Sequence, residues 1–302
     1  MTEWLGFAIA WLLLKFLGFL PRRLARGVAA FTASMLLVLL PKFRRVAMFN
    51  LHLAFPDWPD GRRKTAIQNM TRYLGWQAVE FARFRRYDRE SIDEIIEIEG
   101  HENFLQAQRR GQGVLILTGH IGAWELSSFA HAVYGYPMHY MARPLDNARL
   151  DAFVNRYRSL SGNQPIYKNE SARAVLKSLN NAGVVGILAD QNTLPEEGAF
   201  VDFFGKTACT TTGIARLALH TEAAVVPGYA YWDTGAQKYK LRFEPEVEIS
   251  NTGNSEHDII ENTQRFAKIT EEIIRKFPDQ WVWVHARWKT RPDGEPPLYD
   301  FL

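Results

Sequence analysis

The sequence predicts an α/β protein with a mostly parallel central sheet flanked by helices. Short apolar runs, such as residues 113–117 and 183–189, alternate with helical segments along the chain, as parallel strands and their crossover helices do. Both runs lead directly to polar residues, His120 and Asp190. Since open α/β sheets bind ligands at the carboxyl ends of their strands, we expect the functional site at this edge.

An apolar N-terminal segment precedes the predicted sheet. Residues 4–20 form a nearly continuous apolar run, interrupted only by Lys15, and this is about the minimum length that spans a bilayer. Three arginines follow within residues 22–26, whereas no basic residue precedes the run. The positive-inside rule therefore predicts a membrane-anchoring helix with the body of the protein in the cytoplasm, and the missing N-terminal charge argues against a cleavable signal.

A second apolar run covers residues 27–40 and ends at Pro41. It is too short to span a bilayer, so we expect a helix that lies in the membrane interface or packs on the protein. These two runs divide the chain into an anchoring and interfacial part, residues 1–40, and a single globular domain, residues 41–302. An alternative remains open, in which both runs are core helices of a soluble protein.

The rest of the chain alternates helices and strands, with no internal repeat. Apolar residues at helical spacing predict a core-facing helix at 65–84, after a loop at 55–61 that is rich in proline and glycine. A long aromatic loop is expected through residues 196–205. Further helices are predicted at 102–110, 152–160, 172–181, 213–220 and 257–277, and further strands at 139–142, 224–231 and 238–243.

Composition narrows the class of protein. The 302 residues are 47% hydrophobic and 13% aromatic, which indicates a well-buried core or a membrane-facing surface and excludes a disordered chain. The net charge is only +3, but basic residues gather in the first third, which suggests an anionic partner unless they are simply solvated helix faces. A single cysteine, Cys209, excludes a disulfide framework and a cysteine-based zinc site.

The most suggestive functional residues are His120 and Glu125, which follow the first predicted strand with four residues between them. If Glu125 lies early in the next helix, its carboxylate can reach one imidazole nitrogen while the other faces a substrate. This pair could act as a general base with its orienting carboxylate, and the nucleophile would be a hydroxyl of the substrate. A hydrogen-bonded histidine at a turn is the simpler alternative.

Other residues favour an anionic, amphiphilic substrate. Arg143 follows a predicted strand and precedes a proline, where it could meet a phosphate or carboxylate, or could simply be solvated. Near the C-terminus, three tryptophans in residues 281–288 stand beside His285, Arg287 and Lys289. They could form an aromatic and basic lip, or the tryptophans could fill the core.

Several separated stretches together resemble the lipid A biosynthesis acyltransferases, the late acyltransferases within the glycerolipid-acyltransferase-like superfamily. They run in order over almost the whole chain, which makes them far more specific than the His120 and Glu125 pair alone. The matching stretches are the apolar N-terminus, Gly119–Glu125, Arg143–Asn147, Asp190–Gln191, Phe203–Gly205 leading into Thr210–Gly213, and Pro278–Lys289.

The resemblance implies a glycerolipid-acyltransferase-like fold and a membrane-associated O-acyltransferase at the cytoplasmic face of the bacterial inner membrane. The donor would be a thioester on acyl carrier protein, the acceptor a hydroxyl of a lipid A precursor, and neither metal nor cofactor would be needed. His120 and Glu125 would be the catalytic dyad. The substrate-binding candidates are Arg143, Asp146, Asn147, Arg158, Asp190, Gln191, Thr211, His285, Arg287 and Lys289.

Two positions depart from the family pattern, because many members have asparagine in place of Ala123 and an acid in place of Asn192. Both lie near the expected acceptor, so another glycolipid or a lysophospholipid remains an alternative acceptor, and acyl-CoA an alternative donor. A hydrolase of lipid esters would need an activated nucleophile, and the sequence has no Gly-x-Ser-x-Gly elbow to supply one. A non-catalytic membrane or partner-binding protein would explain only the first third, and no nucleic-acid reader motif is present. The sequence does not predict the oligomeric state.

Overall fold

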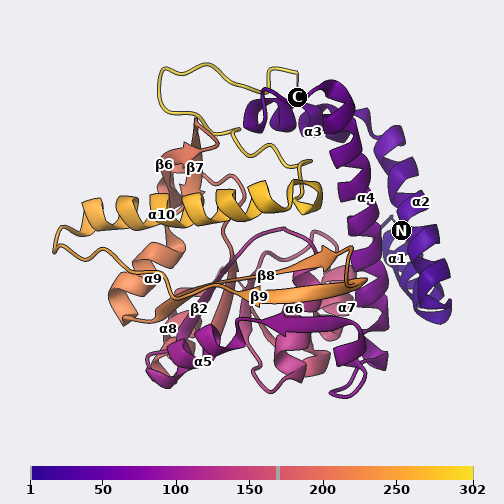
Figure 1. Ribbon diagram of the computed structural model, residues 1–302, viewed down its shortest axis with the longest axis horizontal. Coiled ribbons are helices and arrows are strands. Elements are labelled where there is room, and N and C mark those ends of the chain that lie inside the picture. The colour runs from indigo at the N-terminus through magenta and orange to yellow at the C-terminus, as the bar shows by residue number, and fades with distance from the viewer. Residues whose placement is uncertain (1, 168–170, 302) are drawn as a thin grey trace.

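A computed structural model describes residues 2–167 and 171–301 (Figure 1). Its main sheet has seven strands in the order β1-β9-β8-β2-β5-β3-β4, and every pairing is parallel except β8 with β9. The predicted α/β class with a mostly parallel sheet is confirmed. The strands of this sheet are β1 (Ile96–Glu99), β2 (Val114–Thr118), β3 (His139–Ala142), β4 (Gln164–Tyr167), β5 (Val184–Leu188), β8 (Ala224–Asp233) and β9 (Lys238–Phe243).

Helices cover both faces of this sheet (Figure 1). The helices are α1 (Thr2–Phe19), α2 (Arg22–Leu39), α3 (Pro41–Ala54), α4 (Asp60–Arg83), α5 (His101–Arg109), α6 (Trp124–Val133), α7 (Ala148–Arg158), α8 (Ser171–Asn180), α9 (Gly213–Thr221) and α10 (Ser255–Lys276). Single 3-10 turns lie at Phe84–Arg86, Ile92–Glu94, Ser159–Ser161, Pro195–Glu197 and Pro278–Gln280.

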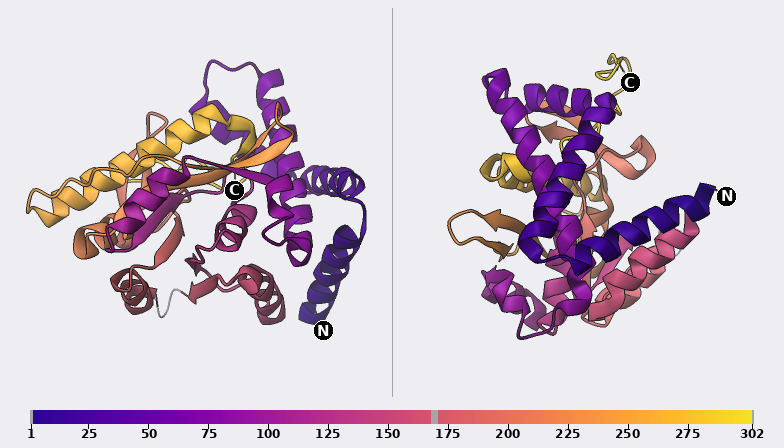
Figure 2. Two further views of the ribbon diagram at one scale, coloured as in Figure 1. Left: turned by 60° about the horizontal axis from the view of Figure 1, so that its bottom comes forward. Right: turned by 90° about the vertical axis from the view of Figure 1, so that its right-hand side faces the viewer.

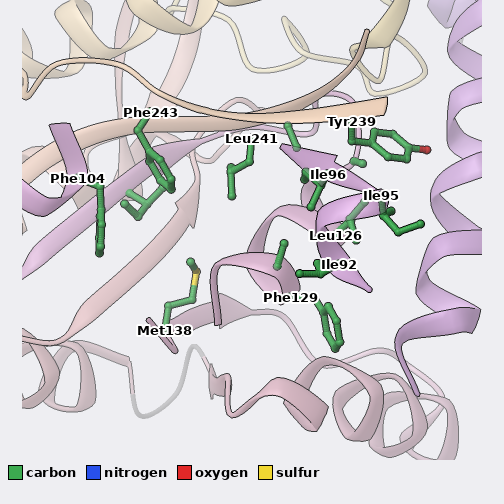
Figure 3. Close-up of a cluster of buried hydrophobic side chains, with 14 of the residues drawn as sticks. Ile92, Ile95, Ile96, Phe104, Leu126, Phe129, Met138, Tyr239, Leu241 and Phe243 are labelled. Atoms are coloured by element: carbon green, nitrogen blue, oxygen red, sulfur yellow. The ribbon is translucent and has the colours of Figure 1, made fainter. Parts of the chain in front are cut away.

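The central strand β2 shows why its sequence is apolar throughout. Val114 and Ile116 face the core under α5 and α6, whereas Leu115 and Leu117 face the core under α8 and α9. Alternate side chains of a strand point to opposite faces, so a strand covered on both sides needs an unbroken apolar run. Figure 3 shows the first of these cores, with Phe104 of α5 beside Phe243 of β9, and with Leu126 and Phe129 of α6 near Ile92.

The segment predicted as a long aromatic loop is instead a two-stranded hairpin, β6 (Gly198–Phe203) with β7 (Lys206–Thr211). Its two turn residues, Phe204 and Gly205, both have positive φ, +58° and +72°. This is the geometry of the tight turns that suit hairpins, for which Asn-Gly is the usual signal. Because the first turn position is a phenylalanine, the sequence has no recognisable hairpin signal there.

The first two helices pack on α4 and α7 rather than standing apart from the protein (Figure 2). α2 runs so close to α4 that a Cβ on Gly75 would lie 2.7 Å from the backbone of Ala29. The Glu80 side chain, fully buried on α4, accepts hydrogen bonds from Arg22 and Arg26 of α2. Small residues and a buried ion cluster therefore fix α2 against α4.

The outer face of these helices remains apolar and exposed, and we call it the outer apolar face. Among the described residues no single helix is long and apolar enough to cross a membrane, although α2 and α3 together meet the criteria of length and composition, with a bend of 93° between them. The predicted anchoring helix and the division of the chain at residue 40 stay predictions. The outer apolar face includes Trp4, Leu5, Ile9, Leu12, Phe16, Phe19, Phe31, Met35, Leu36, Val38, Leu39, Leu40 and Phe43.

Candidate active site

A cavity of about 450 Å³ opens at the carboxyl ends of β2, β3 and β5. This is the edge at which the sequence predicts the site. Both polar and apolar side chains line the cavity. Its polar side chains include His120, Glu125, Arg143, Arg158, Gln191, Asn192 and Thr211, and its apolar ones include Ile116, Trp124, Met138, Tyr140, Met141, Ile187 and Leu188.

His120 is held by a buried carboxylate. Its ring Nδ1 lies 2.9 Å from Oδ1 of Asp190, and its backbone N–H donates to Oδ2 of the same side chain at 2.7 Å. Trp281 donates its indole N–H to that Oδ2, also at 2.7 Å. Because the carboxylate accepts, Nδ1 carries the proton and Nε2 keeps its lone pair, with the Gln191 amide 3.4 Å away. His120 is thus oriented as a general base.

The predicted orienting partner, Glu125, does not occupy this position. It lies in the first turn of α6 and pairs with Arg158, which donates from Nε to Oε2 at 2.9 Å and makes a second contact through its terminal nitrogen. The hydrogen bond to the ring belongs to Asp190, which the sequence prediction assigned to substrate binding. Glu125 remains beside His120 in the cavity wall, and its charge helps to raise the pKa of His120.

Strand register explains the true partner. β2 and β5 are adjacent and parallel, and Thr118 pairs with Leu188. His120 and Asp190 each come two residues after these last paired positions, so the two side chains leave the sheet side by side. The equal offsets of His120 and Asp190 from the ends of their strands are visible in the sequence, but they pair the two residues only once β2 and β5 are known to be adjacent.

The two groups shift each other's pKa. Burial opposes protonation of His120, but the charge and hydrogen bond of Asp190 outweigh it and raise the pKa of the imidazole above 6.5. Burial also favours the neutral form of Asp190, yet His120 and the donated hydrogen bonds hold its pKa at about 2. Asp190 therefore stays ionised at neutral pH, and His120 is a stronger base than a free histidine.

Two glycines make room for this arrangement. A Cβ on Gly119 would lie 3.0 Å from the carboxyl carbon of Asp190, so any side chain there would push the carboxylate away. Gly122 has φ +55°, and a Cβ on it would approach the carbonyl oxygen of Ala230 to 1.9 Å. The turn from β2 into α6 therefore requires glycine at this second position.

Two arginines, Arg143 and Arg158, line the cavity. Arg143 lines the cavity with an exposed side chain, and Arg158 lies over the ring of Tyr140 at 5.5 Å while it binds Glu125. Gln191 and Thr211 also line the cavity. Four of the predicted substrate-binding residues thus line the same cavity as His120, and a fifth, Asp190, binds its ring.

Two other candidates from the same stretch have different surroundings. Asn147 caps α7 by accepting from the N–H groups of Arg149 and Leu150, and its amide donates to the carbonyl of Glu3 in α1. Asp146 is exposed beside it, outside the residues that line the cavity. Asn147 accordingly has a structural role in joining α1 to α7.

Of the two interpretations of the C-terminal tryptophans, the structure supports a core role and contradicts the aromatic and basic lip. Trp281, Trp283 and Trp288 are almost completely buried, because they fill the core between α3, α4 and the β6–β7 hairpin. A long apolar face on α3 and α4 needs a partner, and this C-terminal segment supplies it. Buried Asn50 of α3 fixes the segment by donating to the carbonyls of Trp283 and His285.

The basic residues of that segment also lie outside the cavity lining. His285 accepts from the backbone N–H of Asn192 at 3.0 Å, and burial lowers its pKa to about 4, so it positions the loop after β5 as a neutral ring. Arg287 is buried and donates to the carbonyl of Cys209 and the hydroxyl of Thr210. Lys289 is exposed.

The two departures from the family pattern have distinct environments. Ala123 is fully buried, and its N–H donates to the carbonyl of Ala230. Asn192 lines the cavity and donates to the hydroxyl of Thr290. Only Asn192 of the two is therefore placed to contact a substrate.

Comparisons with known proteins agree over nearly the whole chain. The model of a family described as bacterial lipid A biosynthesis acyltransferase matches residues 1–290. The lipid A biosynthesis palmitoleoyltransferase of Escherichia coli (strain K12) is 27% identical over 297 residues, which cover 98% of this chain and 94% of that protein. The lauroyltransferase of the same strain is 26% identical over 304 residues, with the same coverage, 98% and 94%.

A lipid A biosynthesis acyltransferase of Haemophilus influenzae is 25% identical over 297 residues, or 98% of this chain and 90% of its own length. These relatives span the N-terminal helices as well as the sheet. The chain therefore belongs to the bacterial lipid A biosynthesis acyltransferase family and is an acyltransferase.

Proposed function

We propose that this protein transfers a fatty acyl chain from an acyl carrier protein thioester to a hydroxyl of a lipid A precursor. The observation that carries the proposal is the His120 ring, whose Nδ1 binds buried Asp190 while Nε2 has only the Gln191 amide nitrogen, 3.4 Å away, in the lining of the cavity. The names of the relatives, a lauroyltransferase and a palmitoleoyltransferase of lipid A biosynthesis, support the acceptor class.

In the proposed reaction, Nε2 of His120 removes the proton of the acceptor hydroxyl as its oxygen attacks the thioester carbonyl. The tetrahedral intermediate then collapses, the C–S bond breaks, and His120 returns the proton to the departing thiolate. General-base help of this kind is worth roughly 10²- to 10⁴-fold in rate. Asp190 holds the tautomer and stabilises the imidazolium, as the carboxylate of a triad does.

In this proposal Glu125, paired with Arg158, has a different role from the one that its spacing from His120 suggests. The pair forms one wall of the cavity next to His120. A phosphate on the acceptor would compete with Glu125 for Arg158 and would also attract Arg143 in the cavity lining. Glu125 thus remains a catalytic candidate as a neighbour that adds negative charge beside His120, while Asp190 orients the ring.

The apolar part of the cavity lining suits an acyl chain. Ile116 of β2, Met138 just before β3 and Ile187 of β5 line it, each earlier in the chain than the polar residues at the carboxyl end of its strand. We further propose that the protein works at the cytoplasmic face of the bacterial inner membrane. The outer apolar face of α1, α2 and the start of α3 supports this location, because exposed apolar side chains on such a scale mark an interaction surface.

A mass-spectrometric assay tests the proposal. Purified wild-type protein and His120→Ala would receive acyl carrier protein thioesters or acyl-CoA, with lipid A precursor, a lysophospholipid or another glycolipid as acceptor. We expect wild-type protein to acylate the lipid A precursor and His120→Ala to fall by at least about 10²-fold. Equal rates for both proteins would contradict the role of His120, and transfer only to another lipid would reject the acceptor.

A further inference from the structure

A second cavity, of about 550 Å³, lies beside α3 and shares no lining residue with the catalytic cavity. α3 crosses the top of the molecule next to the C-terminus (Figure 1). Nothing in the proposed acyl transfer uses this cavity. Its lining residues are Pro41, Arg44, Arg45, Met48, Phe49, His52, Asp60, Arg63 and Phe301.

The charge in this α3 cavity is positive. Arg44 and Arg45 are exposed, and neither takes part in an ion pair within the described part of the chain. Arg63 is only 6% exposed; it binds the Asp60 carboxylate at 2.8 Å, and its buried Nε has no hydrogen-bond partner among the described residues. Because Asp60 offsets Arg63, the uncompensated charge belongs to Arg44 and Arg45.

The walls of the cavity are apolar. Met48 and Phe49 of α3 are only partly buried, and the ring of Phe49 meets that of Phe301 at 5.4 Å between centroids. The cavity also adjoins the outer apolar face, since Phe43 and Leu40 immediately precede its two arginines and are exposed. A ligand here would meet two guanidinium groups at one end and hydrocarbon at the other.

We propose that the α3 cavity binds one anionic glycerophospholipid of the membrane, with its phosphate between Arg44 and Arg45 and a hydrocarbon segment against Met48 and Phe49. Arginine binds phosphate with a fork of N–H donors, and a basic cluster at a membrane-facing helix recognises anionic lipid. A concave, apolar site beside the outer apolar face fits an amphiphile better than the charged surface of an acidic protein. This site is independent of the catalytic chemistry.

Native mass spectrometry in a neutral detergent tests the proposal. The full-length protein would be mixed with equal amounts of phosphatidylglycerol and phosphatidylcholine of identical acyl chains. Detergent removes the general attraction of an anionic membrane, so a preference must come from a site on the protein. We expect the phosphatidylglycerol adduct to exceed the phosphatidylcholine adduct by roughly tenfold or more, and to fall to about equality in Arg44→Gln/Arg45→Gln.

A matched control removes two exposed charges elsewhere, in Arg109→Gln/Lys276→Gln on α5 and α10. This control should keep the preference. A preference that survives in Arg44→Gln/Arg45→Gln, or that disappears equally in the control, would overturn the proposal, as would its absence from the wild-type protein. A preference that survives in Arg44→Gln/Arg45→Gln would mean that the lipid binds elsewhere on the protein, for example in the catalytic cavity.

A second variant tests whether lipid binding needs the cavity or only the two exposed charges. Met48→Trp keeps every charge but fills the apolar part of the cavity, so the bound phosphatidylglycerol should fall by roughly tenfold with the melting temperature maintained. Unchanged binding by this variant would reject a site in the α3 cavity. If millimolar inorganic phosphate displaces the bound phosphatidylglycerol, the arginines bind the phosphate group without needing the rest of the lipid. This result would also overturn the proposal.

Discussion

At the scale of single residues, the site depends on how closely β5 approaches the turn after β2. Gly119→Ala would place a Cβ 3.0 Å from the Asp190 carboxyl group, which is tighter than an ordinary contact. The carboxylate must then move by a few tenths of an ångström, and His120 loses its alignment. We expect kcat for acyl transfer to fall by roughly tenfold or more, with little change in KM or melting temperature.

Gly27→Ala is the matched control for this substitution, because Gly27 lies in α2 with nothing within 4 Å of an added Cβ. It should keep wild-type kcat. If Gly119→Ala also keeps wild-type kcat, the close packing of Asp190 on this turn has no catalytic role.

A second residue-scale feature is His131, fully buried on α6 between the rings of Phe104 and Tyr136. Burial, with a smaller effect of His101, lowers its pKa to about 3. On unfolding the ring regains a pKa near 6.5, so below that pH the unfolded state binds more protons than the folded state. The free energy of unfolding should therefore fall as the pH drops through 6.5.

His131→Leu removes this contribution. Relative to wild type, the variant should gain about 2 kcal/mol in free energy of unfolding between pH 7.5 and pH 5.0, whatever its packing cost at pH 7.5. Urea denaturation at the two pH values measures the difference. A difference between the two proteins that does not change with pH would contradict a neutral buried His131.

At the scale of elements, Glu80 is the main polar link between α4 and α2. It accepts from Arg22 and Arg26, and also from the hydroxyl of Tyr87 at 2.6 Å. Glu80→Ala would leave two arginines without their partner at a buried helix contact. We expect it to destabilise the docking of α2 by about 3 kcal/mol, visible as faster amide exchange or proteolysis in residues 22–39.

Glu90, an exposed residue with no ion pair among the described residues, provides the control for Glu80. Glu90→Ala should leave both amide exchange and proteolysis of α2 unchanged. Equal protection of α2 in Glu80→Ala and the wild-type protein would mean that small residues at the contact, such as Gly75, suffice to hold the helix.

The helices and strands differ in how far the sequence predicts them. The strands β2 and β5 were evident, because burial on both faces demands an unbroken apolar run. The β6–β7 hairpin was not, since its turn has Phe204 at a position where asparagine is the recognised signal. The C-terminal tryptophans were ambiguous, because a buried and an interfacial tryptophan look alike until the apolar faces of α3 and α4 are known to lie opposite them.

The site could be predicted in position but not in its pairing. The sequence placed His120 and Asp190 at the carboxyl ends of strands, yet the choice between Asp190 and Glu125 as orienting carboxylate depends on β5 lying next to β2. Adjacency of strands far apart in the chain is set by the whole sheet and leaves little trace in local spacing. The role of Asn147 as a helix cap could have been read from its place before α7.

At the scale of the whole molecule, the fold separates three surfaces with different chemistry. The catalytic cavity opens at one edge of the sheet, the outer apolar face covers α1 and α2, and the α3 cavity adjoins that face. In the function that we propose, a lipid acceptor that enters from a membrane would meet the outer apolar face, and its phosphate would meet Arg143 and Arg158 in the lining of the catalytic cavity.

The central claim is that Asp190 orients His120 and strengthens it as the catalytic base. The pH dependence of kcat/KM for wild-type protein and Asp190→Asn, with an acyl carrier protein thioester and lipid A precursor, tests it most directly. His120 must be neutral to accept a proton, and its pKa is raised by Asp190, so the wild-type rate should fall on the acid side with an inflection above pH 6.5.

Asp190→Asn removes the charge that raises this pKa while burial, which lowers it, remains. The acid inflection should therefore move to lower pH, and the rate on the plateau should fall by roughly 10²- to 10⁴-fold. Asp146→Asn, at an exposed position near the same edge, should change neither. An Asp190→Asn protein with the wild-type inflection and plateau would contradict the account.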